Sequence, residues 1–201
     1  MTRTGKSVTG VILAGGRSTR MGRDKSRLRL DGETLVERAV GRLAPLFDEV
    51  LVVADSADRF DDLGHARIVG DLVPGVGPVG GIYTALKQAC GSAVFVVACD
   101  MPRLDPGVIS RQLGMWSEGD SDALVPVVGG RPEPLHAVYS KRCTPAIEEQ
   151  IRRGEYRVRA LFETVRVRFW EVGPGEARAF ANVNTPDDWA TIIGTGGDPP
   201  C

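Results

Sequence analysis

The sequence reads VTGVILAGG from Val8 to Gly16, a short apolar run that leads directly into a pair of glycines. Such a run, bounded by a glycine turn, is typical of a strand that is covered on both faces of a sheet. Two more runs of this kind follow, Val50 to Ala54 and Ala93 to Cys99. These runs predict a mostly parallel sheet with loops at the carboxyl ends of its strands.

Helical patterns alternate with these strands. Thr34 to Phe47 spaces its apolar residues for one helical face, and Ile82 to Ala89 follows a loop rich in glycine and proline. Pro106 to Trp116 carries proline in its first turn, where a helix tolerates it. Ala66 to Val69 is a further short strand. This alternation predicts a three-layer α/β fold with a mostly parallel central sheet.

The second half of the chain has a different order of elements. We expect strands at Ala123–Val128, Leu135–Tyr139 and Val165–Val172, and helices at Pro145–Arg153 and Thr185–Ile193. No internal repeat and no long linker divides the sequence. We therefore expect one domain over residues 1–194 and a flexible tail over residues 195–201.

Composition excludes several classes of protein. The 201 residues include 25 Lys and Arg against 26 Asp and Glu, and no basic run marks a general nucleic-acid binder. No apolar run approaches the roughly 20 residues of a membrane span, and Met1 to Lys6 lacks the apolar stretch of a signal peptide. We expect a cytoplasmic protein that binds neither nucleic acid nor membranes.

The cysteines show no metal-binding pattern. The chain has four, Cys90, Cys99, Cys143 and Cys201, and no C-x-x-C pair. A zinc site needs tighter clustering, so we expect reduced and mostly buried thiols.

The segment after the first strand has the features of a phosphate-binding loop. Gly15 and Gly16 allow backbone N–H groups to approach an anion, and Arg17, Arg20, Arg23 and Lys25 add positive charge. Such a loop suits a triphosphate, although a plain strand-to-helix turn with solvated arginines would look similar. The dinucleotide fingerprint G-x-G-x-x-G is absent here, and Gly5-Lys6-Ser7 lacks the upstream glycine and strand of a Walker A loop.

Two aspartates follow predicted strands. Asp71 opens a loop with Gly75, Gly77, Gly80 and Gly81, which would let backbone lie against a flat base or ribose, unless it only connects two elements.

Asp100 ends the most apolar strand, where a carboxylate can hold a divalent metal. The alternative is that Asp100 caps a helix before Met101-Pro102.

A polar segment follows the last strand. Thr185, Pro186 and Asp188 form a plausible helix cap and first turn, while the amides of Asn182 and Asn184 could reach a ligand. Taken alone, this segment favours capping.

Together these motifs resemble a known family. The signature LAGG at Leu13–Gly16, with Ser18, Arg20, Met21, Gly22 and Asp24-Lys25, resembles the nucleotidyltransferases that include molybdenum cofactor guanylyltransferase. Cytidylyl and sugar-phosphate members share it. The narrower resemblance comes from segments that occur in the guanylyltransferase order, namely Asp71 with GPVGG at 77–81, CDMP at 99–102, PLHAVY at 134–139 and FANVNTP at 180–186. The resemblance covers Val8 to Trp189.

The resemblance implies a Rossmann-like nucleotidyltransferase fold and an activity. Family members transfer GMP from GTP to the terminal phosphate of molybdenum-molybdopterin, which forms the guanine dinucleotide cofactor and pyrophosphate. By this resemblance, residues 8–100 form the nucleotide-binding half and residues 101–194 the second-substrate half. The implied partners are GTP, molybdenum-molybdopterin, the proteins that carry molybdopterin, and recipient molybdoenzymes.

The resemblance also implies roles for individual residues. The GTP site comprises Leu13, Ala14, Gly15, Lys25, Asp71 and Asp100; Asp100 also binds Mg²⁺; the catalytic set is Arg20, Lys25 and Asp100; and Asn182 and Asn184 match the second-substrate segment. The turn from Arg131 to Pro134 lies where the second-substrate side is expected.

Other functions stay open at the level of sequence. One alternative is a cytidylyltransferase on the same cofactor or a sugar-phosphate nucleotidyltransferase, because no single side chain selects guanine over cytosine. Another is a non-catalytic nucleotide-binding or chaperone-like module. The presence of both Lys25 and Asp100 argues against that module, since loss of either would be the simplest route to an inactive protein.

Overall fold

The computed structural model describes residues 7–15, 26 and 28–193 and is built around one twisted sheet. In spatial order its strands are β10 (Val167–Glu171), β7 (Ala123–Val128), β9 (His136–Ser140), β6 (Ala93–Ala98), β1 (Val8–Leu13), β4 (Val50–Ala54) and β5 (Ala66–Gly70). The short β8 (Arg131–Pro132) pairs with the end of β7.

The sheet is mostly parallel, as the sequence predicts. Only β9 runs antiparallel to its neighbours β6 and β7 along this described path, whereas the other adjacent strands are parallel. The connection from Val128 to His136 is shorter than the dozen or so residues that a parallel crossover requires, so β9 returns beside β7 antiparallel.

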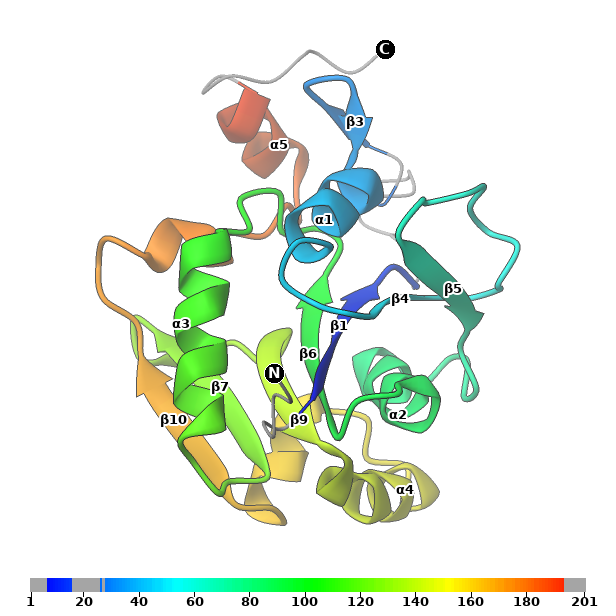
Figure 1. Cartoon of the computed structure of the whole chain (residues 1–201), viewed down its shortest axis with the longest axis vertical. Helices are drawn as coiled ribbons and strands as arrows, with labels where there is room; N and C mark the ends of the chain where they lie inside the picture. Colours follow the sequence, from blue (N-terminus) through cyan, green and yellow to red (C-terminus); the bar gives the residue numbers. More distant parts are fainter. Residues whose placement is uncertain (1–6, 16–25, 27, 194–201) are drawn as a thin grey trace, which may run out of the picture.

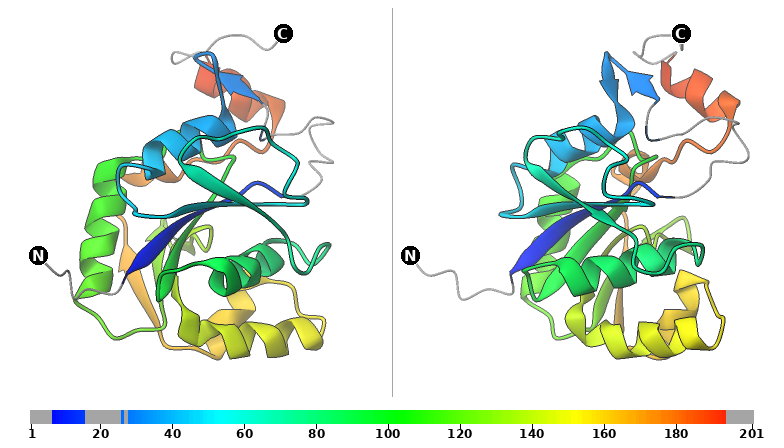
Figure 2. Two further views of the ribbon diagram at one scale, coloured as in Figure 1. Left: turned by 45° about the vertical axis from the view of Figure 1, so that its right-hand side comes forward. Right: turned by 90° about the vertical axis from the view of Figure 1, so that its right-hand side faces the viewer.

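Helices cover both faces of the sheet and confirm the three-layer arrangement (Figures 1 and 2). Helices α1 (Leu35–Leu43) and α3 (Pro106–Ser117) pack with Ile12 of β1 in one apolar cluster. Helices α2 (Pro78–Gln88) and α4 (Thr144–Arg152) pack with Val11 and Leu13 in a second cluster on the opposite face. Successive residues of β1 point to opposite faces, so its apolar end, Val11 to Leu13, supplies both clusters.

A small lobe lies beyond the carboxyl ends of the strands (Figures 1 and 2). We use this name for residues 28–35 and 183–193, which contain the hairpin β2 (Arg29–Leu30) and β3 (Glu33–Thr34) together with α5 (Pro186–Ile193). Its apolar residues form a third cluster, made of Leu28, Leu30, Leu35, Val183, Trp189 and Ile192. The lobe therefore joins chain segments from the two ends of the sequence.

Two predicted helix boundaries are wrong. Helix α1 ends at Leu43 rather than Phe47, because Pro45 has no N–H to extend the helical hydrogen bonds. Helix α2 begins at Pro78 rather than Ile82, so Gly80 and Gly81 belong to its first turns and not to the preceding loop. The other predicted strands and helices agree with the structure to within two residues.

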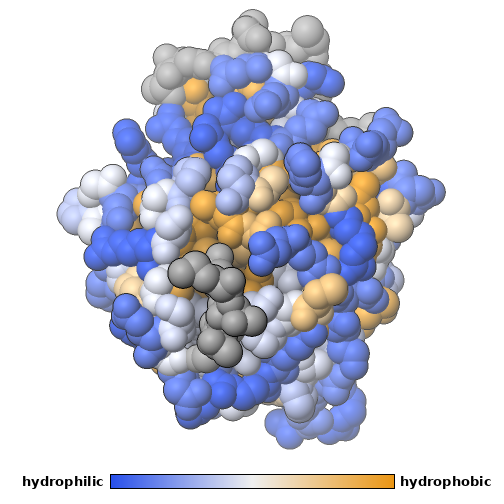
Figure 3. All heavy atoms as spheres, viewed as in Figure 1, coloured by the Kyte–Doolittle hydropathy of each residue, from blue (hydrophilic) through white to orange (hydrophobic). Residues whose placement is uncertain are grey.

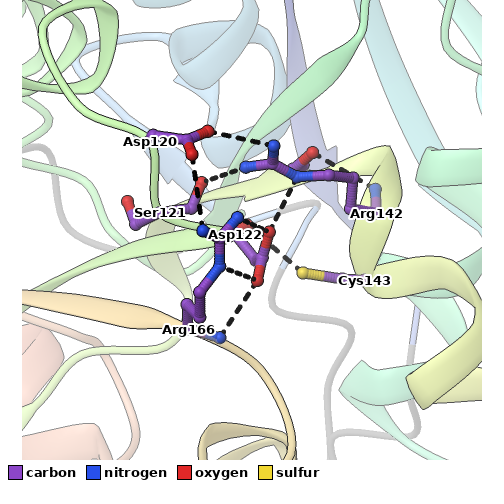
Figure 4. Close-up of polar contacts among 7 residues, drawn as sticks. Asp120, Ser121, Asp122, Arg142, Cys143 and Arg166 are labelled. Carbon is purple, nitrogen blue, oxygen red and sulfur yellow. Dashed lines mark hydrogen bonds and ion pairs between the residues drawn. The ribbon is translucent and has the colours of Figure 1, made fainter.

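An ionic cluster joins three strand ends at the sheet edge opposite the small lobe (Figure 4). Asp122, just before β7, contacts Nε of Arg142 at 2.7 Å and Nε of Arg166 at 3.1 Å. The backbone carbonyl of Asp122 accepts hydrogen bonds from the N–H of Ser140, at 2.8 Å, and from Sγ of Cys143, at 3.2 Å. These contacts fasten β7, β9 and β10 to one another.

The described cysteines are free, but they are not mostly buried as expected. Cys143 is buried, Cys99 is half-buried and Cys90 is exposed. Burial raises the pKa of the Cys143 thiol to about 12, so this thiol stays protonated at neutral pH.

The α1 side of the core is closed partly by loops. Partly buried Leu46, Phe47, Phe60 and Leu63, all outside helices and strands, pack against the cluster under α1 and α3. Figure 3 accordingly shows apolar side chains in the middle of this face, with hydrophilic residues around them. In the described part of the chain, no helix combines the length and apolar character that crossing a membrane requires.

Candidate functional site

The carboxyl ends of β1, β4, β5 and β6 bring several predicted site residues to one edge of the sheet. The N–H of Ala14 donates to the carbonyl of Val53 at 2.8 Å, and the N–H of Asp71 donates to the carbonyl of Ala54 at 2.8 Å. The N–H of Cys99, next to Asp100, donates to the carbonyl of Leu13 at 3.1 Å. The structure thus assembles Leu13, Ala14, Gly15, Asp71 and Asp100, whereas Arg20 and Lys25 lie outside the described residues.

Asp55 is an additional acidic residue at this edge that sequence reasoning missed. It follows β4 directly, and its Oδ1 lies 2.9 Å from the position that a Cβ on Gly15 would take. Asp55 also forms an ion pair of 2.7 Å with Arg59. The signal that could have found Asp55 is the one that marks Asp71 and Asp100, an acidic residue immediately after an apolar strand.

The Asp71 carboxylate shapes the glycine-rich loop. Its Oδ1 accepts hydrogen bonds from the N–H of Val73 at 3.1 Å and from the hydroxyl of Thr84 at 2.8 Å. The Thr84 hydroxyl in turn accepts from the N–H of Leu72 at 2.9 Å. Asp71 therefore ties the start of the loop to α2. Gly77 completes the loop with a φ of 72°, a left-handed conformation that favours glycine.

Asp100 lies half-buried on the turn after β6, and it does not cap a helix. Helix α3 begins at Pro106, and its N-cap is Asp105, whose Oδ1 accepts from the N–H groups of Gly107 and Val108 at 2.8 and 3.1 Å. The capping alternative for Asp100 is therefore wrong. The Asp100 carboxylate lies at the carboxyl edge of the sheet, beside the end of β1.

The segment around Asn182 and Asn184 lies against the Asp100 turn. The N–H of Val183 donates to the carbonyl of Asp100 at 2.9 Å, so the two asparagines flank this contact. The Asn182 Oδ1 is buried and has no hydrogen-bond partner among the described residues. This unused acceptor indicates a position where a ligand group could donate a hydrogen bond.

Capping occurs in the same segment. The Thr185 hydroxyl accepts from the N–H of Asp188 at 3.1 Å, and the Asp188 carboxylate accepts from the N–H groups of Asn184 and Thr185 at 2.9 and 2.8 Å. The predicted cap of α5 is confirmed, and it fixes the backbone that carries both asparagines.

A cleft of about 570 Å³ opens beside this edge, between the start of α2 and the 3₁₀ helix η3 (Val158–Glu163). Pro78, Leu135 and Val158 give it apolar walls, and Tyr156, whose exposed fraction is 46%, lies at its surface with Arg159. The Leu135 carbonyl accepts a hydrogen bond from the N–H of Ala98 at 3.1 Å, which connects the cleft to the strand that carries Asp100.

The cleft borders the turn from Arg131 to Pro134, on the predicted second-substrate side. Arg159 donates from Nη2 to the carbonyl of Pro132 at 2.9 Å. Partial burial raises the pKa of the nearby Glu133 carboxyl. Sequence reasoning missed Tyr156 and η3, because no local pattern places them next to this turn.

The Asp100 carboxylate could be the protein ligand of a magnesium ion that is bound together with a nucleotide. No group of three or more His, Cys, Asp or Glu side chains able to hold a metal occurs within the described ranges. Magnesium commonly takes one or two carboxylates and completes its shell with phosphate oxygens and water. A half-buried carboxylate such as Asp100 meets that requirement.

Comparisons with known proteins agree with this geometry. The sequence profile of the MobA-like NTP transferase domain matches residues 10–169. The chain belongs to the MobA-like NTP transferase family. A probable molybdenum cofactor guanylyltransferase of Pelotomaculum thermopropionicum is 42% identical over 187 residues, which cover 90% of this chain and 89% of the relative. One of Methanothermobacter thermautotrophicus is 37% identical and covers 88% and 94%, respectively.

Solved structures place this member of the MobA-like NTP transferase family among nucleotidyltransferase folds. The molybdopterin-guanine dinucleotide biosynthesis protein A of Archaeoglobus fulgidus superposes with a TM-score of 0.83, at 28% identity over 93% of this chain and 97% of the other. A 2-C-methyl-D-erythritol 4-phosphate cytidylyltransferase of Thermus thermophilus shares the fold at a TM-score of 0.69 and 19% identity, over 92% and 96%. The Rossmann-like fold expected from the resemblance is confirmed.

Proposed function

We propose that this protein transfers GMP from GTP to the terminal phosphate of molybdenum-molybdopterin, with release of pyrophosphate. The names of the relatives support this assignment. The observation that carries it is the junction of three segments at one sheet edge. In the Asp100 turn, the N–H of Cys99 donates to the Leu13 carbonyl, and the Asp100 carbonyl accepts from the N–H of Val183.

The proposed roles follow from position and charge. The backbone of Leu13, Ala14 and Gly15, with Lys25, would bind the triphosphate, and Asp71 and its loop would hold the nucleoside. Helix α2 begins at Pro78, directly after this loop. Its amino end is the positive end of the helix dipole and would favour the triphosphate. Asp100 would hold Mg²⁺, which would supply charge neutralisation at the phosphates when bound.

The chemistry requires positioning more than covalent work by side chains. The attacking group is a phosphate that is already ionised at neutral pH, so no strong general base is needed. The main obstacle is repulsion between two anionic substrates. Arg20 and Lys25 would screen that repulsion and stabilise the departing pyrophosphate, while the sheet edge aligns both substrates.

The cleft beside Leu135 is our candidate for the second substrate. Its apolar walls and Tyr156 suit a flat ring, and Arg157 and Arg159 suit phosphate. Asn182 and Asn184 would lie between this substrate and the nucleotide. Contacts with molybdopterin carriers or recipient molybdoenzymes, and the cytoplasmic location, stay predictions.

The deciding experiment offers the purified protein Mg²⁺ and each NTP in turn, with molybdenum-loaded molybdopterin or with a hexose 1-phosphate. Mass spectrometry then identifies the product. We expect a guanine dinucleotide cofactor from GTP alone. A cytosine dinucleotide from CTP would favour the cytidylyltransferase alternative, and a nucleotide sugar would favour the sugar-phosphate alternative. Absence of all three products would overturn the assignment.

A further inference from the structure

The turn that carries Asp100 is held by its backbone from three directions. The N–H of Cys99 bonds to β1, and the N–H of Met101 donates to the Ala98 carbonyl at 3.3 Å. The carbonyl of Asp100 accepts from Val183 of the small lobe. The carbonyl of Pro102 accepts from Nε of Arg38 in α1 at 3.2 Å. In the last of these four contacts the donor is a side chain.

Arg38 is well placed to hold this carbonyl rigidly. Only 19% of its side chain is exposed, and its Nη1 contacts Oδ2 of Asp31 at 3.2 Å and Oε2 of Glu33 at 3.7 Å. A guanidinium is planar, so bonds from Nε and Nη1 to different acceptors fix its orientation. Arg38 thus bridges the hairpin of the small lobe and the Asp100 turn.

The same helix also holds the turn by packing. Met101 is almost fully buried, in the cluster that contains Val36, Ala39 and Val40 of α1. Pro102 is buried as well, and a buried carbonyl without a partner is costly. The Pro102 carbonyl belongs to the peptide that joins Pro102 to Arg103. Loss of the Arg38 bond would let this peptide rotate toward another donor, and we expect the shift to reach Asp100 through Met101.

We propose that Arg38 is a positioning residue that orients the Asp100 carboxylate for the cation–nucleotide complex. The inference deepens the proposed function and rests on it. Groups that orient a metal ligand from outside its coordination shell commonly alter metal affinity by 10- to 100-fold. Arg38 acts through the backbone, so we expect an effect at the lower end, on the order of tenfold.

The test measures Mn²⁺ binding in the presence of GTP by electron paramagnetic resonance. Arg38→Met, which keeps the apolar stem but removes the donors, should weaken Mn²⁺ binding on the order of tenfold. GTP binding in EDTA should not change. Arg38→Lys keeps the charge near Asp31 but loses the planar fork, so it should weaken Mn²⁺ binding too. It replaces the Met variant if that protein does not fold.

Two control variants separate positioning from general stability. Asp31→Asn keeps an acceptor for Arg38 and tolerates the φ of 53° at this turn, and Arg42→Met removes an exposed arginine from the same helix. Both should bind Mn²⁺ like the wild type. Asp100→Asn is the reference for loss of the ligand itself, and melting curves without ligand show the folded fraction of each variant.

The outcomes distinguish the two assignments. If the wild type binds Mn²⁺ with GTP, Asp100→Asn does not, and Arg38→Met matches the wild type, then Arg38 has no positioning role. Full Mn²⁺ affinity in Arg38→Lys would also overturn the role of the fork. A wild type that takes up no Mn²⁺ with GTP would overturn the proposed function, and the inference about Arg38 with it.

Discussion

Asp100 and Asp105 are five residues apart and form different hydrogen bonds. The Oδ1 of Asp105 accepts hydrogen bonds from two N–H groups at the start of α3. Asp100 lies on the turn after β6, and its backbone carbonyl is the part bonded to Val183. A side chain that caps a helix stabilises the fold, whereas the Asp100 carboxylate is our proposed Mg²⁺ ligand. The two residues form a matched pair for mutagenesis.

Asp100→Asn should cause severe loss of magnesium-dependent turnover and leave the melting temperature near that of the wild type, because Asn keeps the size but not the charge. Asp105→Ala should lose about 1 kcal/mol of unfolding free energy and retain turnover, because it removes a cap. Turnover across a magnesium titration and urea unfolding measure both effects. Wild-type turnover of Asp100→Asn at limiting magnesium would contradict the metal assignment.

Lys25→Ala tests the phosphate-binding loop that the sequence predicts after β1. Removal of one charge-assisted hydrogen bond to the triphosphate should weaken GTP binding or turnover by about 1.5–3 kcal/mol. The fold should survive. Lys87→Ala is a suitable control, since Lys87 is exposed on α2, where it pairs with Glu148 at 3.6 Å and lies over the Tyr83 ring. Equal activity of the Lys25→Ala and Lys87→Ala variants would show that Lys25 is a solvated charge and does not bind the triphosphate.

At the scale of elements, the start of α2 depends on close approach of the loop that precedes it. A Cβ on Gly80 would lie 2.7 Å from the Val73 carbonyl oxygen and 2.7 Å from Cγ2 of Val76. Gly80→Ala should therefore destabilise the protein by about 1–3 kcal/mol, although alanine has the higher helix propensity. Nucleotide binding should weaken with it, because the Asp71 loop must move.

Gly114→Ala in α3 is the matched control for this substitution. Nothing lies within 4 Å of its added Cβ, so propensity alone should act and stabilise the protein by about 0.5–1 kcal/mol. Denaturant unfolding measures the change in unfolding free energy for Gly80→Ala and Gly114→Ala. Stabilisation by Gly80→Ala would show that the loop around Val73 and Val76 moves aside at little cost, so that glycine is not required at position 80.

The ionic cluster at the opposite edge predicts acid sensitivity. Hydrogen bonds from the Arg166 side chain lower the pKa of Asp122 despite its partial burial. This contribution is complete above the unfolded-state pKa of about 3.9 and is lost as the pH falls through the lower folded-state value. Asp122→Asn should thus cost about 1–3 kcal/mol at neutral pH and flatten the acid limb of the stability curve.

Urea unfolding between neutral pH and about pH 3 measures this difference for Asp122→Asn and the wild type. Asp120→Asn is the control, because Asp120 contacts the same arginines but is largely exposed, so its loss should matter much less. Identical pH profiles of the wild type and Asp122→Asn would rule out the cluster as the source of acid sensitivity.

The candidate site forms only when the complete sheet brings β1, β5 and β6 together. GTP with magnesium should therefore stabilise the folded state, by about 2.7 kcal/mol at one hundred times its Kd. Thermal unfolding should show a larger shift with GTP than with CTP or ATP at matched concentrations. Equal shifts with all three nucleotides would contradict the choice of guanine.

Much of the fold follows from patterns within short stretches of sequence. Continuous apolar runs predict β1, β4 and β6. The boundaries of α1 and α2 were wrong because Pro45 and the packed Gly80 act through hydrogen bonds and contacts that apolar periodicity does not describe.

Local patterns suffice to show which acidic and glycine residues end the strands, and hence that Leu13–Gly15, Asp71 and Asp100 share one edge. Folding in three dimensions was needed to show that β9 lies between β6 and β7, that Asp55 lies against Gly15 and that Arg38 bonds the Pro102 carbonyl, 64 residues away. The difference lies in the distance along the chain over which each interaction acts. Propensity and periodicity act over a few residues, whereas these contacts depend on the order in which the strands assemble and on which faces then meet.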